Sequence, residues 1–576
     1  MTSTDATSGV AEKLDALYEF ERSPVTEDRL QPPSYFAGFF AGEHVAATEF
    51  VIGALLVSFG ASAKDIVLGL LLGNLFAVLS WTLICAPISV DTRLTLYWYL
   101  RRVAGPGVTI LYNLLNAVMY CILAGAMITV SASAVRLPFG IPAQTKWYPE
   151  DARFVLVVLI VGAVVVTLAI LGFRRLAQFA MVASPWMFLM FIAGAVVMLP
   201  RLAAVLPGGE ISSVGDLWTI ASETIWTGAP ADGETALGFW HVVSFAWVVN
   251  LSMHVGLADM AIFRYARHAR YGLFSAFGMY LGHYLAWMCA GVMGVAVAHV
   301  LKTPLTELDS GDVAYQALGV AGALAVVIAG WTTSNPTLYR AGLALQVITP
   351  GWPRWKVTAI AGMITSIVAC SPFVFTKLLD FIGLYGILLM PIGAIVVLEH
   401  WVVPRLGWTQ FWASRKGLFV SWPALIAWLV SVALGLAAWS TGRIHLFLLG
   451  VPVWICTAVL YLALAAFAGA REKLPEEAAA PAGTPPDGGS PGRTDSKGPR
   501  SVAWFVSGAV ALVGLAMCVA LPVWMFVLPR AEYDASMGTF KTLLFATTLV
   551  YLVAGVVWMG ESEKRRRPAE GQGATS

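Results

Sequence analysis

Apolar runs about 20 residues long recur along almost the whole chain. A helix of about 20 apolar residues crosses the roughly 30 Å hydrocarbon core of a bilayer. Of the 576 residues, 58% are hydrophobic and only 12% are charged, whereas a soluble globular chain carries about 25% charged residues. The sequence therefore predicts an all-α, polytopic membrane protein. The length of the chain reflects the number of membrane spans and not the number of soluble domains.

The apolar runs predict about fourteen spans. Ten of them form two sets of five, two more follow, and the last two come after a polar segment. We expect the spans near residues 36–59, 66–88, 108–130, 154–171, 179–199, 241–258, 274–300, 314–338, 357–370, 379–397, 418–439, 446–468, 502–527 and 540–559.

The polar segments divide the chain further. Residues 471–500 are rich in Pro, Gly, Glu and Ala and cannot bury an apolar face, so we expect a disordered cytoplasmic linker there. The expected parts are a cytoplasmic tail at 1–35, a twelve-helix core at 36–470, that linker, two added helices at 501–560, and a basic cytoplasmic tail at 561–576.

The basic residues predict the orientation. When the N-terminus is placed inside, most of the 36 Lys and Arg fall in inside segments, as is typical of cytoplasmic loops. The tail lacks the basic and then apolar pattern of a cleaved signal peptide. We expect a multi-pass protein of the cell (inner or plasma) membrane with both termini in the cytoplasm.

Several function classes are disfavoured. A formal net charge of +2 is too small to attract nucleic acid through the overall electric field of the protein. The six cysteines lie in apolar runs without paired or metal-ligand spacing, which is typical of core packing. Because the sequence has no phosphate loop, zinc motif or nucleophile elbow, we expect no enzyme and no cofactor. The expected partners are membrane lipids and a small-molecule substrate, and the oligomeric state stays open.

Ionisable groups within predicted spans are costly and indicate function. Glu43, His44 and Glu49 interrupt the first span, and His254 lies on the sixth. In transporters built from inverted repeats these two helices are equivalent and often unwound at the midplane. We therefore expect Glu43, His44 and His254 to line one central cavity, with Glu43 able to carry a proton. The alternative is that Glu43 and a histidine merely pair at a helix contact, and Glu49 is as easily explained by packing.

The eighth span carries Thr332, Thr333, Ser334 and Asn335 just before Pro336. Hydroxyl and carbonyl oxygens suit a hard cation such as sodium, so this cluster is a candidate ion or substrate site. The alternative is that the hydroxyls bond back to their own helix, whose hydrogen bonding Pro336 weakens.

Aromatic and amide side chains flank the proposed cavity. Trp247 and Asn250 lie on the sixth span, and Asn116 and Tyr120 on the third. They would either stack on a flat ligand or pack helices. The other histidines, His283 among them, are expected mostly near span ends, where a hydrated imidazole costs little.

Five strings, taken in order, resemble the nucleobase:cation symporter-1 family, purine and cytosine permease-like proteins with the leucine-transporter fold. The resemblance covers about residues 35–470. The strings are GLLLGN (69–74), Arg93 followed by AGPG (104–107), Ser184-Pro185, WTTSNPTLYRAGLALQ (331–346) and Met390 to Gly393.

The resemblance implies a 5+5 inverted repeat and uptake of a flat nucleobase-like heterocycle, driven by sodium or protons. Thr332 and Thr333 would match sodium ligands, completed by carbonyls near residues 38–41. Asn335, Tyr120 and Asn250 would lie near the substrate. The sequence departs from the family pattern where Glu43-His44 replaces a neutral polar residue, where Asn250 replaces a stacking aromatic, and in its two added helices.

Other functions stay open. An amino-acid or betaine symporter would share the fold, and a membrane sensor or accessory subunit would bind without transport. A metalloenzyme using His44, His254 and His283 would need three converging ligands.

Overall fold

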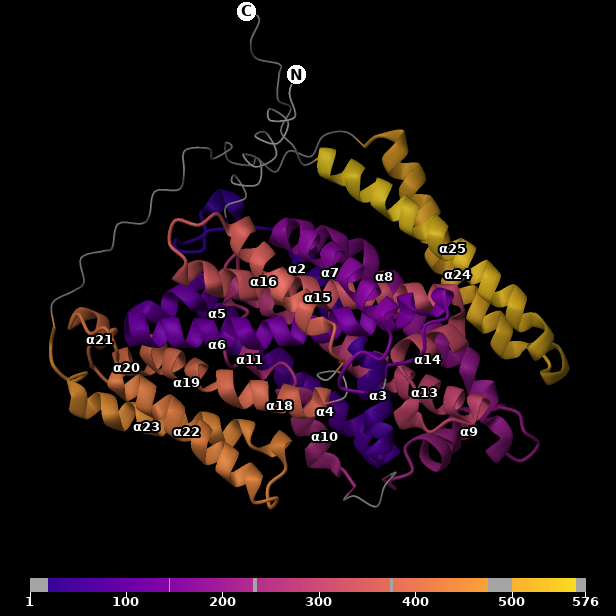
Figure 1. Cartoon of the computed structure of the whole chain (residues 1–576), viewed down its shortest axis with the longest axis horizontal. Helices are drawn as coiled ribbons and strands as arrows, with labels where there is room; N and C mark the ends of the chain where they lie inside the picture. The colour runs from indigo at the N-terminus through magenta and orange to yellow at the C-terminus, as the bar shows by residue number, and fades with distance from the viewer. Residues whose placement is uncertain (1–18, 145, 231–235, 373–376, 475–499, 566–576) are drawn as a thin grey trace, which may run out of the picture.

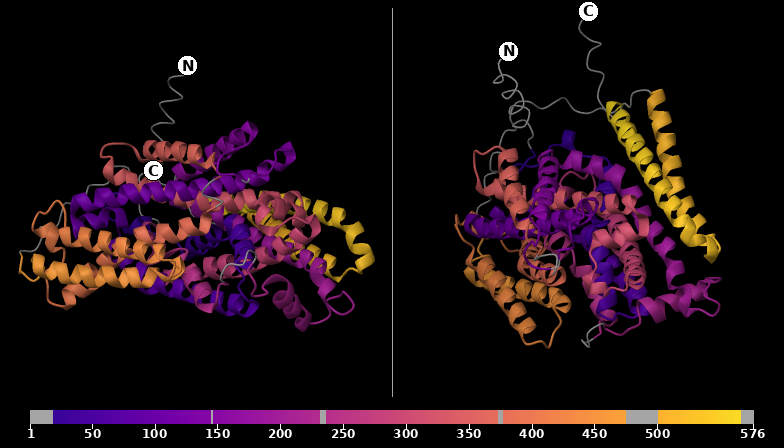
Figure 2. Two further views of the ribbon diagram at one scale, coloured as in Figure 1. Left: turned by 60° about the horizontal axis from the view of Figure 1, so that its bottom comes forward. Right: turned by 45° about the vertical axis from the view of Figure 1, so that its right-hand side comes forward.

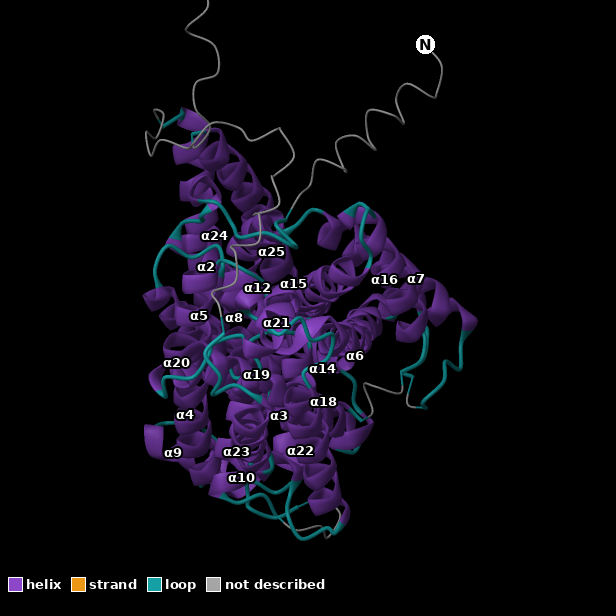
Figure 3. Cartoon of the chain, turned by 90° about the vertical axis from the view of Figure 1, so that its left-hand side faces the viewer, coloured by secondary structure: helices purple, strands orange, loops and turns teal. Residues whose placement is uncertain are grey.

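The computed structural model describes residues 19–144, 146–230, 236–372, 377–474 and 500–565. Most of the expected tail at 1–35, most of the linker and the end of the basic tail lie outside these ranges. The regular elements of the described residues are helices, apart from one isolated bridge between Ser62 and Thr227 (Figure 3).

Ten helical segments of the described chain are long and apolar enough to cross a membrane, or eleven if the bent pair α2 (Pro33–His44) and α3 (Thr48–Ser58) forms one span. Three more of the predicted spans are present as helices that fall outside this length and apolarity test: α10 (Phe239–Val248), α15 (Val320–Ile348) and α16 (Arg354–Ala369). The all-α prediction is confirmed, and fourteen spans stays a prediction.

The other helices follow the predicted order (Figure 1). They are α4 (Ala63–Ser80), α5 (Ala86–Thr92), α6 (Leu96–Val135), α7 (Ala152–Ile170), α8 (Phe173–Met198), α9 (Val214–Ile220), α11 (Leu251–His254), α12 (Met260–Phe263), η7 (Phe277–Ala286), α13 (Trp287–Leu301), α14 (Ser310–Leu318), α18 (Leu378–Leu389), α19 (Pro391–Val397), α20 (Val403–Arg405), α21 (Trp412–Arg415), α22 (Trp422–Ser440), α23 (Gly450–Ala468), α24 (Val502–Val527) and α25 (Arg530–Lys564).

Two helical stretches are interrupted at the centre of the bundle. The axis bends by 52° between α2 and α3, and α10, α11 and α12 follow one another with breaks between them. Glycines let neighbouring helices approach both breaks. A Cβ at Gly282 would lie 1.9 Å from the His44 carbonyl oxygen, and one at Gly393 would lie 1.9 Å from that of Val255. The backbone at the breaks is thus enclosed by protein.

Helix α15 forms the centre of the packing. Its most extensive contact is with α6, and it also packs on α2, α7, α8 and α16. The span predicted at 314–338 is in fact two helices, because α14 ends before Gly319, whose φ is +63°, and α15 starts a new direction there. Helix α15 then continues to Ile348, ten residues beyond the predicted end.

The two added helices form a hairpin on one flank of the core, and α22 and α23 lie on the opposite flank (Figure 2). The hairpin packs mainly on α8. Tyr551 Oη donates to the Val182 carbonyl at 2.6 Å, and Trp186 Nε1 donates to Thr548 Oγ1 at 3.0 Å. Helix α25 begins at Arg530, ten residues before the start of the predicted span.

Candidate functional site

A buried cluster of three charged side chains lies where the interrupted helices meet. Glu43 is on the last turn of α2, Asp259 precedes α12, and Arg340 lies within α15. Their exposed fractions are 3%, 0% and 0%. Arg340 Nη2 donates to Glu43 Oε2 at 3.0 Å, and Arg340 Nε donates to Asp259 Oδ1 at 3.0 Å. Two carboxylates thus share one guanidinium.

Helix geometry explains why two residues of α15 contact the end of α2. Thr333 and Arg340 are seven positions apart, about two turns, so both side chains lie on the same face of α15. Thr333 Oγ1 donates to the Glu43 carbonyl at 2.7 Å, and Arg340 binds the carboxylate of the same residue. Any motion of α2 relative to α15 must change both contacts.

Aromatic rings and imidazoles surround the charged cluster. Trp81 Nε1 donates to Asp259 Oδ2 at 2.6 Å. The centroid of the Trp81 ring lies 5.7 Å from that of His44 and 4.7 Å from that of His254, and His44 lies 5.2 Å from His283. The structure therefore brings Glu43, His44 and His254 together, with Trp81 and Asp259 between them.

Several buried polar atoms near the breaks have no hydrogen-bond partner among the described residues. Leaving such an atom unpaired costs about 1–3 kcal/mol. Several of them near the same breaks therefore indicate a place where a polar partner binds. They would be satisfied by a polar ligand or by water. The atoms are His44 Nε2, His254 Nδ1, His283 Nδ1, Asn250 Nδ2, and both Asn335 side-chain atoms, Oδ1 and Nδ2.

The other predicted residues fall in separate places. Tyr120 packs edge-on against Tyr385, with ring centroids 5.6 Å apart, and Ser252 bonds the Tyr385 hydroxyl. Asn250 precedes α11 and is 7% exposed. Thr332 and Asn335 line a void of about 10 Å³ between α2, α8 and α15, which is about the size that one water needs.

The hydroxyl cluster on α15 shows the back-bonding that was the alternative to an ion site. Thr332 Oγ1 and Thr333 Oγ1 both bond the Ala329 carbonyl, at 3.0 and 3.1 Å, and Ser334 Oγ bonds that of Gly330 at 2.7 Å. Thr333 also reaches Glu43, two residues beyond the carbonyls expected at 38–41. Two hydroxyls and two carbonyl oxygens therefore lie close together, which is a donor set that suits sodium.

Arg340 is the principal residue that the sequence prediction missed. The predicted eighth span ends at Leu338, so the sequence places Arg340 in the cytoplasmic segment that follows. The structure corrects this, since α15 continues and the guanidinium is buried. Arg264 follows the sixth predicted span and is placed in a cytoplasmic segment for the same reason, but it is also buried, and its Nη1 donates to the Phe20 carbonyl at 2.7 Å.

His283 was expected near a span end, and this expectation is wrong. Its side chain is 3% exposed and its ring stacks on Trp287 at 4.4 Å. The indole of Trp287 in turn bonds the Glu49 carboxylate, so Glu49 takes part in a buried packing contact. In the part of the chain that the structure describes, no group of three or more His, Cys, Asp or Glu side chains is placed to hold a metal ion.

Comparison with known proteins gives structural matches only. No family model matches the sequence, and no curated protein matches it. A solved structure of Mhp1, a nucleobase-cation-symport-1 family transporter in a closed conformation with bromovinylhydantoin bound, superposes with a TM-score of 0.61 at 14% identity, covering 78% of this chain and 96% of that one.

A second match is a Na⁺-coupled sialic acid symporter in a substrate-bound outward-open state. Its TM-score is 0.55 at 14% identity, covering 81% of this chain and 97% of that one. Likeness at this identity establishes the fold. The chain therefore has the leucine-transporter fold that Mhp1 represents, as its sequence motifs predicted.

Proposed function

We propose that this protein is a cation-coupled secondary transporter that moves a small nitrogenous solute by alternating access. The observation that carries the proposal is the buried Glu43, Arg340 and Asp259 cluster at the breaks of the two interrupted helices. Interrupted helices at the midplane are where transporters of this architecture bind substrate and ions. The multi-pass, all-helical fold supports the same conclusion.

The charge of the cluster supports cation coupling. With both carboxylates ionised, one guanidinium leaves a net charge of −1 in a site that the described protein encloses almost completely. An uncompensated buried charge is expensive. One sodium ion or one proton would neutralise it, so occupancy by the cation and closure of the site are linked energetically.

The surroundings of the cluster support a flat heterocycle as solute. Unpaired imidazole atoms on His44 and His254, together with the unpaired amide of Asn250 at the break before α11, provide both donors and acceptors, and the Trp81 ring lies beside both imidazoles. A nucleobase or hydantoin carries ring nitrogens and carbonyl oxygens, which can pair with these donors and acceptors. The hydantoin bound to Mhp1 is of this chemical class.

The amino-acid alternative would need a binding group other than Arg340. That guanidinium is already held by Glu43 and Asp259, so a solute carboxylate would have to bind the backbone at the helix breaks or the coupling cation. A sensor that binds without transport would use the same donors and acceptors, so only a measurement of flux separates it from a transporter.

The test is uptake by the full chain in proteoliposomes. Labelled nucleobases, hydantoins, amino acids and betaines would be offered under an inward sodium gradient or an inward proton gradient. We expect accumulation of one heterocycle class under one gradient, and loss of accumulation in Asp259→Asn. Arg153→Gln, which removes an exposed pair with Asp151, is the matched control and should transport normally. Specific binding without accumulation under either gradient would contradict the transporter and favour the sensor.

A further inference from the structure

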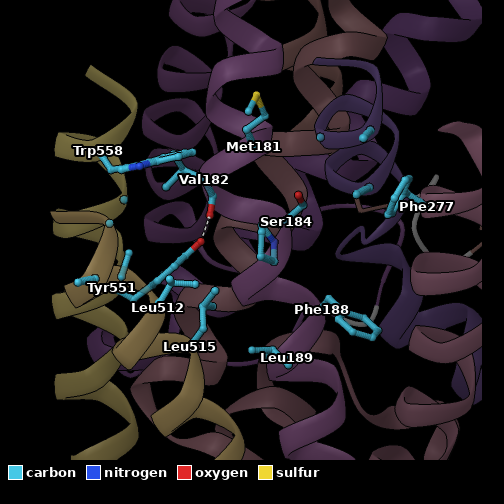
Figure 4. A pocket seen from close by; sticks show the side chains of 18 of the residues that line it. Met181, Val182, Ser184, Phe188, Leu189, Phe277, Leu512, Leu515, Tyr551 and Trp558 are labelled. Carbon is cyan, nitrogen blue, oxygen red and sulfur yellow. Dashed lines mark hydrogen bonds between the residues drawn. The ribbon is translucent and has the colours of Figure 1, made fainter. Parts of the chain in front are cut away.

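A large apolar cavity lies outside the site described above, between the core and the C-terminal hairpin. Its volume is about 860 Å³, within the roughly 300–1,000 Å³ typical of ligand pockets. Figure 4 shows Leu512, Tyr551 and Trp558 of the hairpin on one side. Residues of α2, α8 and η7, Met181 and Phe277 among them, form the other side.

The lining of this cavity suits a hydrocarbon chain. Two of its aromatic side chains already use their polar atoms, because Tyr551 Oη donates to the Val182 carbonyl at 2.6 Å and Trp504 Nε1 donates to Ser562 Oγ at 2.8 Å. A hydrated solute would lose its water there and find few partners in return, Ser184 and Trp558 among them, at a cost of several kcal/mol for each polar group left unpaired. The cavity is therefore unsuited to the solute of the central site.

The cavity also borders surface that faces away from the protein. Phe505, Leu512 and Phe277 line it and remain 52%, 69% and 45% exposed. In a membrane protein such apolar surface at the level of the spans faces the acyl chains of the bilayer. A chain can thus enter the cavity sideways from the membrane.

Positive charge collects at one end of the cavity. The Arg500 guanidinium lies 4.9 Å from the Trp504 ring centroid, and that of Arg565 lies 5.1 Å from it. The nearby carboxylates are engaged: Glu561 pairs with Lys564, and Glu563 with Arg174. Basic clusters next to a membrane helix attract anionic lipid headgroups, by about 1 kcal/mol per Lys or Arg.

We propose that this cavity binds one acyl chain of an anionic phospholipid, whose phosphate lies beside Arg500. The lipid belongs to the leaflet at the start of α2 and the end of α25, since Glu563 of α25 bonds Tyr35 of α2 at that end. Because Gly38 and Ala41 of α2 also line the cavity, the lipid contacts the half-helix that carries Glu43 on its last turn. This inference is independent of the proposed transport function.

The test compares two lipids on the full chain purified in detergent. Native mass spectrometry would count retained phosphatidylglycerol and phosphatidylcholine, and thermal unfolding would be followed as each is added, since a ligand that binds the folded state raises its stability. We expect one phosphatidylglycerol retained per chain and a larger rise in Tm than phosphatidylcholine gives. Equal retention and equal shifts for the two lipids in the wild type would overturn the proposal.

Three variants, one of them a control, locate the site. Ala509 is exposed and lines the cavity, so Ala509→Trp should fill it and weaken the response to phosphatidylglycerol about tenfold. Ala516 lies on the same helix, is exposed, and lines none of the described cavities, so Ala516→Trp is the matched control and should respond like the wild type. Arg500→Gln should keep lipid binding but lose the preference for phosphatidylglycerol. An undiminished response in Ala509→Trp would place the lipid elsewhere and refute the assignment.

Discussion

Arg340 Nη2 lies 3.0 Å from Glu43 Oε2, although 297 positions separate the two residues in the chain. The same guanidinium bonds Asp259. One side chain on α15 therefore joins the end of α2 to the start of α12, the two places where the interrupted helices break. A change in the charge of this cluster acts directly on the segments that alternating access would move.

Removal of the guanidinium should destabilise the fold strongly. Arg340→Gln leaves two buried carboxylates without their cation, and breaking a buried ion pair costs about 3–5 kcal/mol. We expect a clearly lower Tm for the purified protein. The double variant Glu43→Gln/Arg340→Gln should recover part of the loss, because one of the two orphaned charges is gone. If Arg340→Gln unfolds at the wild-type temperature, the cluster does not hold the helices together.

Neutralising one carboxylate should abolish the dependence of solute binding on a cation. In Glu43→Gln the cluster holds one carboxylate and one guanidinium, so no net charge remains to be compensated. We expect solute to raise the Tm of this variant equally in sodium and potassium and equally at pH 6 and pH 8. Wild-type protein should show dependence on at least one of these variables. A variant that keeps the wild-type dependence would show that the coupling cation binds elsewhere.

Substitution of Thr333 distinguishes coupling to sodium from coupling to protons. Thr333→Ala removes an oxygen that contacts both Ala329 and Glu43, and Thr333→Ser restores it. If sodium binds at these oxygens, the Ala variant should lose sodium-dependent stabilisation and the Ser variant should keep most of it. Thr337→Ala is the control, since the Thr337 hydroxyl bonds only the Thr333 carbonyl in the described structure. Equal sodium dependence in Thr333→Ala and wild type would rule out this sodium site.

The hairpin should be held to the core by a small number of polar contacts. Tyr551→Phe removes the bond to the Val182 carbonyl, which would leave that buried carbonyl oxygen short of one partner. We expect a loss of about 1 kcal/mol, the typical net value of a hydrogen bond, and increased hydrogen exchange in α24 and α25. Tyr315→Phe, at an exposed tyrosine of α14, should leave both measurements unchanged. Unaltered exchange in Tyr551→Phe would show that this hydrogen bond does not hold the hairpin to the core.

The sequence was sufficient for the all-α fold class because a long apolar run can be recognised locally as a helix, without knowledge of its partners. It also singled out Glu43, His44 and His254, since an ionisable group in an apolar run is visible locally. It could not identify Arg340 or Trp81, or place His283 in the buried packing around them, because these roles come from partners far along the chain. The predicted helix boundary also hid Arg340. The predicted span ends two residues after Pro336, whereas α15 continues for twelve residues beyond this proline.

The N-terminal segment gives a pH prediction outside the spans. This segment joins the end of α12 to α15, since the Phe20 carbonyl accepts from Arg264 and the Glu19 carboxylate accepts from Tyr265 and Tyr339 at 2.6 and 2.9 Å. Glu21 is buried beside it, with Arg354 Nε 3.9 Å from its Oε1. Burial raises the pKa of Glu21 above its ordinary value, and Arg354 and Arg264 oppose this only in part.

The raised pKa of Glu21 determines how the stability of this segment changes with pH. A carboxyl group whose pKa is higher in the folded state favours folding most when it is protonated, below its unfolded pKa of about 4.3. That stabilisation is lost as the pH rises through the folded value. We expect residues 19–31 to exchange amide hydrogens more readily at pH 8 than at pH 5, after correction for intrinsic rates. Glu21→Gln should remove most of this difference, whereas Glu27→Gln, at an exposed position, should retain it. Faster exchange in Glu21→Gln at both pH values would instead mean that attraction to Arg354 outweighs the cost of burying the charge.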